Sequence, residues 1–219
     1  MATSRMSCIV VVVALAAVLL PAVNAENLTL TPRSIVNQSG TTVESGGMRW
    51  LGTGANAALS RLGVVFAAPA LPTTALRSAR LVVTAAWTQW IPVDVAIAAV
   101  LDPAPADFGP HALPSERSLT APATHYAENT RWGANSVYSI DVTAPVRALL
   151  ERYARPAAIA LVAAGQGTAW GRKYFATGTA VPRLELAFDD PPAPAPAPVA
   201  SQSPSAAGPA AAGAPLPAL

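Results

Sequence analysis

Short runs of apolar and β-branched residues, separated by glycine and proline, make up most of this 219-residue chain. Alternation of apolar and polar positions predicts strands, because successive side chains of a strand point to opposite faces of a sheet. The clearest case is the segment 183–188, where Leu184, Leu186 and Phe188 fall on one face. Seven or more such strands predict an all-β fold, a jelly-roll-like sandwich of two antiparallel sheets. The other predicted strands are 60–66, 80–85, 93–98, 137–140, 158–162 and 172–175.

One segment breaks this pattern and predicts a short amphipathic helix of about Pro145 to Tyr153. Proline suits the first turn, where its missing N–H would have no partner, and Thr143 precedes it as a capping residue. Arg147 and Glu151 are expected to form an exposed pair. Because about ten residues make a marginal helix in water, we expect its apolar stripe to dock over the open end of the sandwich. The stripe consists of Val146, Leu149, Leu150 and Tyr153.

The segment 103–135 is the irregular part of the predicted domain. It has several prolines and contains both histidines, His111 and His125. A loop of this length is uncommon in a compact domain unless it is functional or hides an element. We expect a loop with one short strand near 118–120. Neither histidine belongs to a helical metal-binding pair, so both are expected to be loop residues rather than metal ligands or catalytic groups.

The first 25 residues have the features of a secretory signal peptide. Arg5 supplies a positive charge, residues 8–20 are apolar, and small residues precede a cleavage point after Ala25. An uncleaved anchor is the alternative, but the run is shorter than the roughly 20 residues of a membrane span. Cys8 is the only cysteine, and its removal would leave no thiol or disulfide. These features predict a secreted, extracellular or cell-surface protein without a membrane span after cleavage.

Composition divides the rest of the chain into three parts. We expect an N-terminal segment at 26–36, the folded domain at 37–189 and a disordered tail at 190–219, in which most residues are proline or alanine. Asn27 and Asn37 each begin an Asn-x-Ser/Thr sequon, so both are possible N-glycosylation sites in a eukaryotic secretory pathway.

Four pieces of sequence occur in a characteristic order. They are Arg-Leu-Gly-Val-Val-Phe at 61–66, Ser-Ala-Arg-Leu at 78–81, Tyr-Ser-Ile-Asp-Val-Thr at 138–143, and Phe175 followed by Pro-Arg-Leu-Glu-Leu at 182–186. Together they resemble the DNRLRE-type secreted β-sandwich modules, which are related to the family-96 carbohydrate-binding modules. The resemblance spans about residues 40–188. It implies a jelly-roll-like module of secreted or cell-surface proteins, some of which bind acidic polysaccharides while others are structural or adhesive.

Carbohydrate sites stack aromatic faces on sugar rings and use polar groups for hydroxyls or carboxylates, so the five tryptophans are candidates. Trp50 and Trp87 are expected in the core, since Trp87 continues the alternation of strand 80–85. The other three are expected at the surface, with local packing as the alternative. The arginines beside them, together with Lys173, would suit an acidic glycan. The predicted carbohydrate-binding residues are Trp90, Trp132, Trp170, Arg131 and Arg172.

Other classes of function find little support in the sequence. The net charge of +2 gives no basic field for nucleic acid. No Gly-x-Ser-x-Gly motif occurs, and no pattern brings two carboxylates together, so we predict a protein that is not an enzyme. No cofactor is predicted; a structural Ca²⁺ is an alternative, and Asp141 is expected to interact with the start of the helix rather than with a metal. The sequence therefore predicts a module that binds polysaccharide, acidic glycans included. The alternative is a structural or adhesion protein of the cell surface or extracellular matrix that has no sugar ligand.

Overall fold

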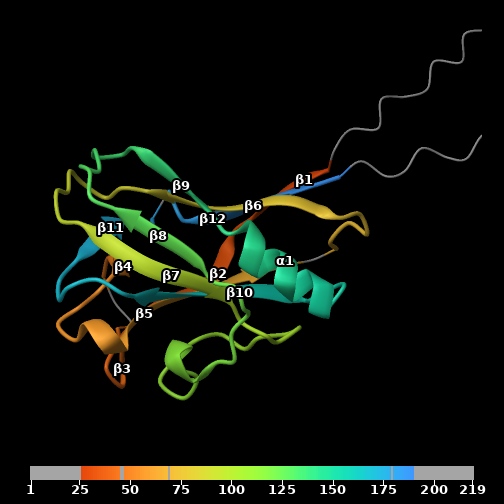
Figure 1. Ribbon diagram of the computed structural model, residues 1–219, viewed down its shortest axis with the longest axis horizontal. Coiled ribbons are helices and arrows are strands. Elements are labelled where there is room, and N and C mark those ends of the chain that lie inside the picture. Colours follow the sequence, from red (N-terminus) through yellow and green to blue (C-terminus); the bar gives the residue numbers. More distant parts are fainter. Residues whose placement is uncertain (1–25, 45–46, 69, 179, 190–219) are drawn as a thin grey trace, which may run out of the picture.

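Antiparallel β-sheets and one α-helix make up the folded chain in the computed structural model (Figure 1). The structure describes residues 26–44, 47–68, 70–178 and 180–189, so the predicted signal peptide and C-terminal tail lie outside the described residues. The elements are β1 (Asn27–Leu30), β2 (Pro32–Ser39), β3 (Thr42–Glu44), β4 (Arg49–Gly52), the 3₁₀ turn η1 (Ala57–Leu59), β5 (Ser60–Ala67), β6 (Leu76–Thr84), β7 (Val93–Ala99), the 3₁₀ turn η2 (Pro114–Glu116), β8 (Thr124–Glu128), β9 (Val137–Asp141), α1 (Thr143–Arg152), β10 (Ala158–Gly165), β11 (Arg172–Phe175) and β12 (Arg183–Phe188).

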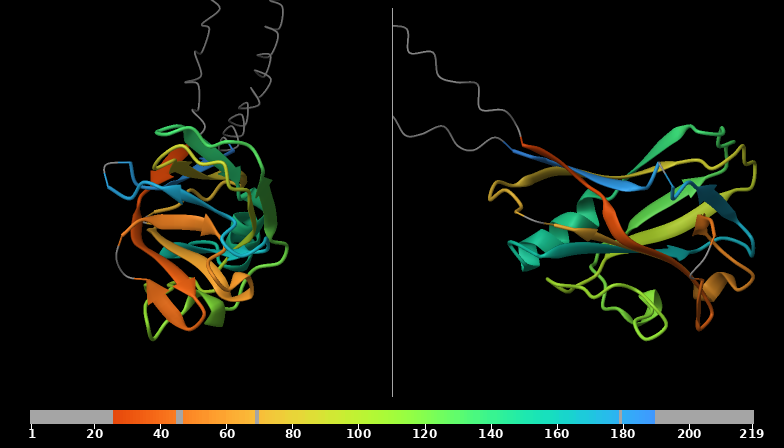
Figure 2. Two further views of the ribbon diagram at one scale, coloured as in Figure 1. Left: turned by 90° about the vertical axis from the view of Figure 1, so that its left-hand side faces the viewer. Right: turned by 180° about the vertical axis from the view of Figure 1, so that it is seen from behind.

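The strands form two main sheets that pack face to face, which confirms the predicted all-β sandwich (Figure 2). One sheet has the order β1-β12-β6-β9, and the other has the order β3-β2-β5-β10-β7-β8. A third sheet, of β11 and β4, lies at one end of the sandwich (Figure 1). Neighbouring strands are antiparallel throughout the described residues. The seven strands predicted between residues 60 and 188 all exist, with bounds shifted by a few residues.

The main core lies between the two large sheets. In β12, Leu184, Leu186 and Phe188 are buried and the residues between them are half-buried, so the predicted apolar face is the core face. Opposite them, the six-stranded sheet contributes alternate side chains to the same apolar cluster. These include Phe66, Val95, Ile97, Ile159 and Leu161.

The ordered domain begins earlier than the predicted boundary at Asn37. β1 pairs with β12 in one sheet, and β2 pairs with β5 in the other. Asn37 itself lies inside β2. The prediction of a separate N-terminal segment at 26–36 is therefore wrong, because both strands in it pair with strands of the two main sheets.

The irregular segment 103–135 covers the outer face of the six-stranded sheet. There Phe108 packs in a second apolar cluster with residues that include Val65 and Val162. Gly63 makes room for the ring, because a β-carbon at that position would lie 2.6 Å from Phe108 Cδ2. This long loop is therefore ordered by a core of its own.

The same segment contains a strand, but not at 118–120, where the chain forms an isolated bridge between Leu119 and Val100. The strand is β8, which pairs with β7 at the edge of the six-stranded sheet. His125 therefore lies on an edge strand rather than in a loop, and its Nε2 is 2.7 Å from Asp94 Oδ1. The mixed sequence of β8, Thr-His-Tyr-Ala-Glu, gave no apolar alternation from which to predict it.

The helix α1 forms within two residues of its predicted bounds and packs against β6 and β7. Its apolar stripe is turned to the core, with Val146 and Leu149 fully buried and Leu150 and Tyr153 partly buried. The predicted pair of Arg147 and Glu151 is not among the ion pairs of the described residues. Arg147 instead donates a hydrogen bond to the Leu76 carbonyl (3.2 Å), which ties the helix to the start of β6.

Polar contacts at the start of α1 also differ from the prediction. Thr143 does not cap the helix, since its Oγ1 accepts a hydrogen bond from the Ala79 N–H (2.9 Å) and so joins the helix to β6. The Asp141 carboxylate accepts a hydrogen bond from the Thr143 N–H (2.8 Å). Hydrogen bonds from Thr143 lower the pKa of Asp141. Asp141 thus has the structural role expected for it.

Candidate functional site

Figure 1 shows the end of the sandwich opposite α1, which we call the aromatic end because it carries exposed tryptophan side chains. It is formed by the turn 85–92 after β6, the connection 129–136 after β8 and the loop 166–171 after β10. Such a concentration of exposed apolar area is typical of an interaction site. Four of the exposed large apolar side chains in the described residues lie on these segments, and Val137 follows directly at the start of β9; the four are Trp87, Trp90, Ile91 and Trp170.

Strand β11 forms the centre of the aromatic end because its side chains alternate between two environments. Arg172 and Tyr174 are half-buried on the outer face, whereas Lys173 and Phe175 are fully buried beneath it. The pairing with β4 places Trp50 opposite Tyr174 on the outer face. A two-stranded sheet thus closes this end and carries Arg172 and two rings on one side, of which the Trp50 ring is buried and the Tyr174 ring is partly exposed.

Four side chains form a continuous row across β11, which we call the aromatic row: Trp87, Tyr174, Arg172 and Trp170. The rings of Trp87 and Tyr174 are stacked, with centroids 4.9 Å apart. The guanidinium carbon of Arg172 is 4.8 Å from the Tyr174 centroid and 4.6 Å from that of Trp170. It also lies 5.4 Å from the centroid of the buried Trp50 ring. Arg172 has no ion pair within the described part of the chain, so its planar fork is available for a carboxylate or sulfate.

The backbone fixes Trp170 at the end of the aromatic row. Trp170 has φ of 66°, a left-handed conformation that is unfavourable for a bulky residue. Its N–H donates a hydrogen bond to the Gly54 carbonyl (3.0 Å). The neighbouring chain approaches so closely that a β-carbon on Gly52, which has φ of 127°, would lie 2.2 Å from the Gly171 oxygen. The ring is 54% exposed although its backbone is firmly held, which is an arrangement suited to contact with a ligand.

A second aromatic–cation pair lies beside the row. The Arg131 guanidinium carbon is 5.2 Å from the centroid of the Trp90 ring, which is 68% exposed. A backbone bridge between Gln89 and Trp132 holds these two segments together. The Gln89 side chain also donates a hydrogen bond to the Tyr174 carbonyl (2.7 Å). Gln89 therefore connects the Trp90–Arg131 pair to the aromatic row.

Lys173, the only lysine in the sequence, is buried beneath the aromatic row. Its Nζ donates hydrogen bonds to the carbonyls of Thr130 (2.8 Å) and Gln89 (3.3 Å) and lies 5.9 Å from the Trp132 centroid. Burial lowers the pKa of Lys173, and the charge of Glu128 acts in the opposite direction. The expectation that Lys173 contacts a glycan directly is wrong. Its ammonium joins the two backbone segments that present the second pair.

Two tryptophans differ from their predicted environments. Trp132, expected at the surface, is fully buried and stacks on Tyr138 with centroids 4.1 Å apart, so its ring is not available to a ligand. Trp87, expected in the core, is 38% exposed. The strand that precedes it ends at Thr84, and the turn after it breaks the alternation. Trp50 is buried as predicted.

The structure brings together four of the five predicted site residues. It also adds two rings that the prediction omitted, Trp87 and Tyr174. The alternation of 172–175 could have identified Tyr174, because it shares a face with Arg172. Trp87 could not be identified in this way, since its exposure depends on where β6 ends. The four residues are Trp90 with Arg131 and Trp170 with Arg172.

One predicted modification site is incompatible with the fold. Asn37 is fully buried, its Nδ2 donates to the Trp50 carbonyl (2.8 Å), and its Oδ1 accepts from the Trp50 N–H (3.0 Å). The prediction of a glycan on Asn37 is therefore wrong, because the amide nitrogen is occupied and enclosed. Asn27 is exposed on the edge strand β1 and stays a predicted site.

No group of three or more His, Cys, Asp or Glu side chains that could hold a metal ion occurs in the residues that the structure describes. No helix within those residues is long and apolar enough to span a membrane. His111 is exposed in the loop, as expected. The absence of catalytic activity and of a cofactor remain predictions.

Comparisons with known proteins assign no family to the chain. A scan against protein-family models finds no match, and a search of curated proteins finds none with significant similarity. The resemblance to DNRLRE-type modules therefore stays a prediction.

Proposed function

We propose that this protein is a non-catalytic module of the extracellular space or cell surface that binds polysaccharide at its aromatic end. The aromatic row is the observation that carries the proposal. Exposed rings on a firmly held backbone provide flat apolar faces on which the less polar faces of sugar rings can stack. The row extends over several side chains, which suits a chain of sugars better than a single one.

Acidic glycans are the favoured ligands because of the two arginines. The Arg172 and Arg131 guanidiniums each lie against exposed aromatic rings. A sugar that stacks on Trp170 or Trp90 would bring a ring carboxylate or sulfate within reach of the neighbouring arginine. Binding of this kind should weaken as ionic strength rises, because the charged groups are near the surface.

The test is a polysaccharide array probed with the full chain, with neutral, carboxylated and sulfated members. We expect binding to acidic polysaccharides that decreases with salt. Trp170→Ala should weaken it by about three- to tenfold, the loss expected for one stacked ring. Leu101→Ala is the matched control, since Leu101 is an exposed large apolar residue outside the aromatic end. If no member of the array binds, or if both variants lose the same affinity, the proposal is wrong.

A structural or adhesion protein is the second candidate. The exposed aliphatic side chains of Ile91 and Val137 favour it, because they would not stack on a sugar but would pack against a protein surface. In that case, cross-linking at a cell surface should capture a protein through the aromatic end while the polysaccharide array stays blank.

A further inference from the structure

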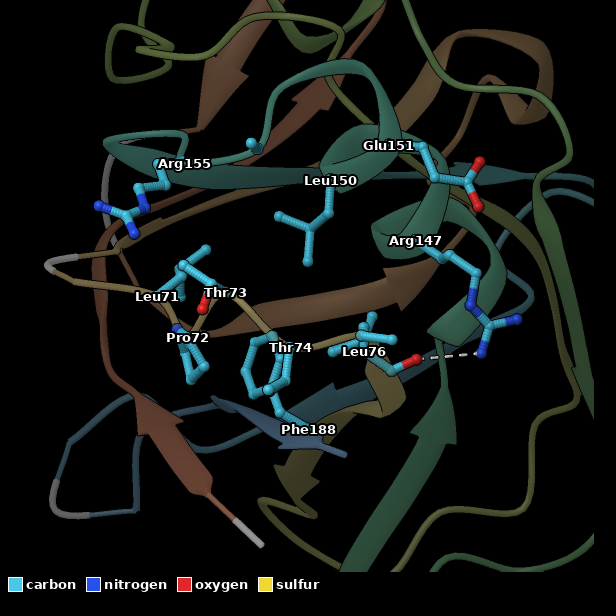
Figure 3. A pocket seen from close by; sticks show the side chains of 12 residues that line it. Leu71, Pro72, Thr73, Thr74, Leu76, Arg147, Leu150, Glu151, Arg155 and Phe188 are labelled. Atoms are coloured by element: carbon cyan, nitrogen blue, oxygen red, sulfur yellow. Dashed lines mark hydrogen bonds between the residues drawn. The ribbon is translucent and has the colours of Figure 1, made fainter. Parts of the chain in front are cut away.

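A second concave site lies at the opposite end of the molecule, beside α1 (Figure 3). It is a cavity of about 290 Å³ between the second half of α1, the connection 71–76 before β6, and the last residue of β12. It shares no residue with the aromatic end. A ligand bound in this cavity would therefore be independent of the proposed polysaccharide site.

The walls of this cavity are mainly aliphatic and aromatic. Leu150 points into it from α1, and Leu71, Pro72, Leu76 and Phe188 lie on the other sides (Figure 3). The half-buried Leu150 packs against the main core. A water molecule occupies about 30 Å³ in the liquid, so the cavity has room for roughly ten non-hydrogen atoms. The walls favour an apolar group of that size over water.

The charges at the mouth of the cavity favour an anion. Two arginines and one glutamate line the mouth, which leaves an excess of one positive charge; Arg155 lies on one side, and both the Arg147 guanidinium and the Glu151 carboxylate point away from the cavity on the other (Figure 3). Arg147 is held by its hydrogen bond to the Leu76 carbonyl (3.2 Å). Arg155 takes part in no ion pair within the described ranges, so its guanidinium is available to a carboxylate.

We propose that this cavity binds a small amphipathic carboxylate: a short acyl chain or a single aromatic ring, of about ten non-hydrogen atoms in all, with one carboxylate group. The apolar body lies against Leu150, Leu76 and Phe188. The carboxylate lies at the mouth and accepts hydrogen bonds from Arg155.

Titration of the full chain with sodium octanoate, followed by calorimetry or NMR, tests this site. Octylamine has the same apolar body with the opposite charge, and acetate has the carboxylate without the body. We expect saturable binding of octanoate in the millimolar range or tighter, and at least tenfold weaker binding of both controls. Equal binding of octanoate and octylamine, or no saturation by octanoate, would overturn the proposal.

Two variants examine the assignment of the carboxylate and of the cavity. Arg155→Gln should weaken octanoate binding about fivefold, whereas Arg152→Gln should not, because Arg152, the last residue of α1, is exposed but does not line the cavity. Leu150→Trp should fill the cavity and abolish binding, with thermal unfolding as a check on folding. If the Leu150→Trp protein does not fold, Thr74→Phe closes the cavity from the loop side instead. The proposal is contradicted if the two arginine variants change the affinity for octanoate equally. It is also contradicted if a folded variant with the cavity filled still binds octanoate with full affinity.

Discussion

The two ends of the sandwich are closed in different ways. At one end α1 turns its apolar stripe to the core. The first and last strands, β1 and β12, also pair, and the Phe188 N–H donates a hydrogen bond to the Glu26 carbonyl, so the two ends of the described chain lie side by side (Figure 1). At the other end β4 and β11 close the core but leave three tryptophans exposed above it. Exposed rings lack the stabilisation that burial provides, which is roughly 25 cal/mol per Å² of apolar surface removed from water. The aromatic end is therefore where a partner is expected, and it lies away from the paired ends of the described chain.

The largest expected effect is on the free energy of unfolding, which should distinguish the buried from the exposed rings of the aromatic end. Trp132→Ala should lower the free energy of unfolding by about 3–5 kcal/mol, because it removes a fully buried ring that stacks on Tyr138. Trp170→Ala should change it by about 0.5 kcal/mol or less, since the ring is largely exposed. Urea unfolding followed by circular dichroism measures both. Similar losses from the two variants would show that the aromatic row contributes to stability rather than to a binding surface.

A smaller effect concerns the buried ammonium of Lys173. Its lowered pKa means that the folded protein releases this proton at a lower pH than the unfolded chain, in which the pKa is near 10.5. Between the two values the unfolded chain binds more protons, so the free energy of unfolding should rise with pH. Lys173→Met should lack this rise. Burial also raises the pKa of Tyr126, to about 12, which lowers stability at high pH in both proteins.

The measurement is therefore the difference in the free energy of unfolding between wild type and Lys173→Met as pH increases from 7 to 10.5. The contribution of Tyr126 cancels in this difference. A difference that stays constant across this range would contradict a lowered pKa. Lys173→Arg is a useful companion, because it keeps the charge but is too large for the same enclosure. It should be less stable than Lys173→Met.

The smallest effect is expected at the start of α1. Asp141→Ala should destabilise the protein by about 0.5 kcal/mol at neutral pH, the low end for a carboxylate near a helix start, because the group is exposed. The pKa of Asp141 is lowered in the folded state, so its contribution is present above about pH 3.8 and is lost as pH falls through the folded value. Thermal unfolding should show a larger difference between wild type and Asp141→Ala at pH 7 than at pH 2. A difference of the same size at both pH values would mean that the carboxylate charge is not its source.

Regular periodicity makes several features predictable from the sequence. The apolar positions of β12 and the stripe of α1 identified core faces correctly, because a fixed repeat places alternate or every third and fourth side chain on one side. The environments of Trp87 and Trp132 could not be predicted in the same way. Each depends on where a strand ends and on which distant segment covers the ring, and neither is encoded in the local pattern.

By itself the sequence determined the class of fold, the position of its one helix and four of the residues now found at the aromatic end, because these follow from local periodicity and residue type. Only the tertiary structure decided that Trp87 continues the row, that the Lys173 ammonium joins the segments beneath it, and that Asn37 is enclosed. The reason is physical: such contacts join segments far apart in the chain, as in the hydrogen bond from Lys173 to the Gln89 carbonyl, whose residues are 84 positions apart. Strand pairing brings those segments together, and no local repeat specifies which strands pair.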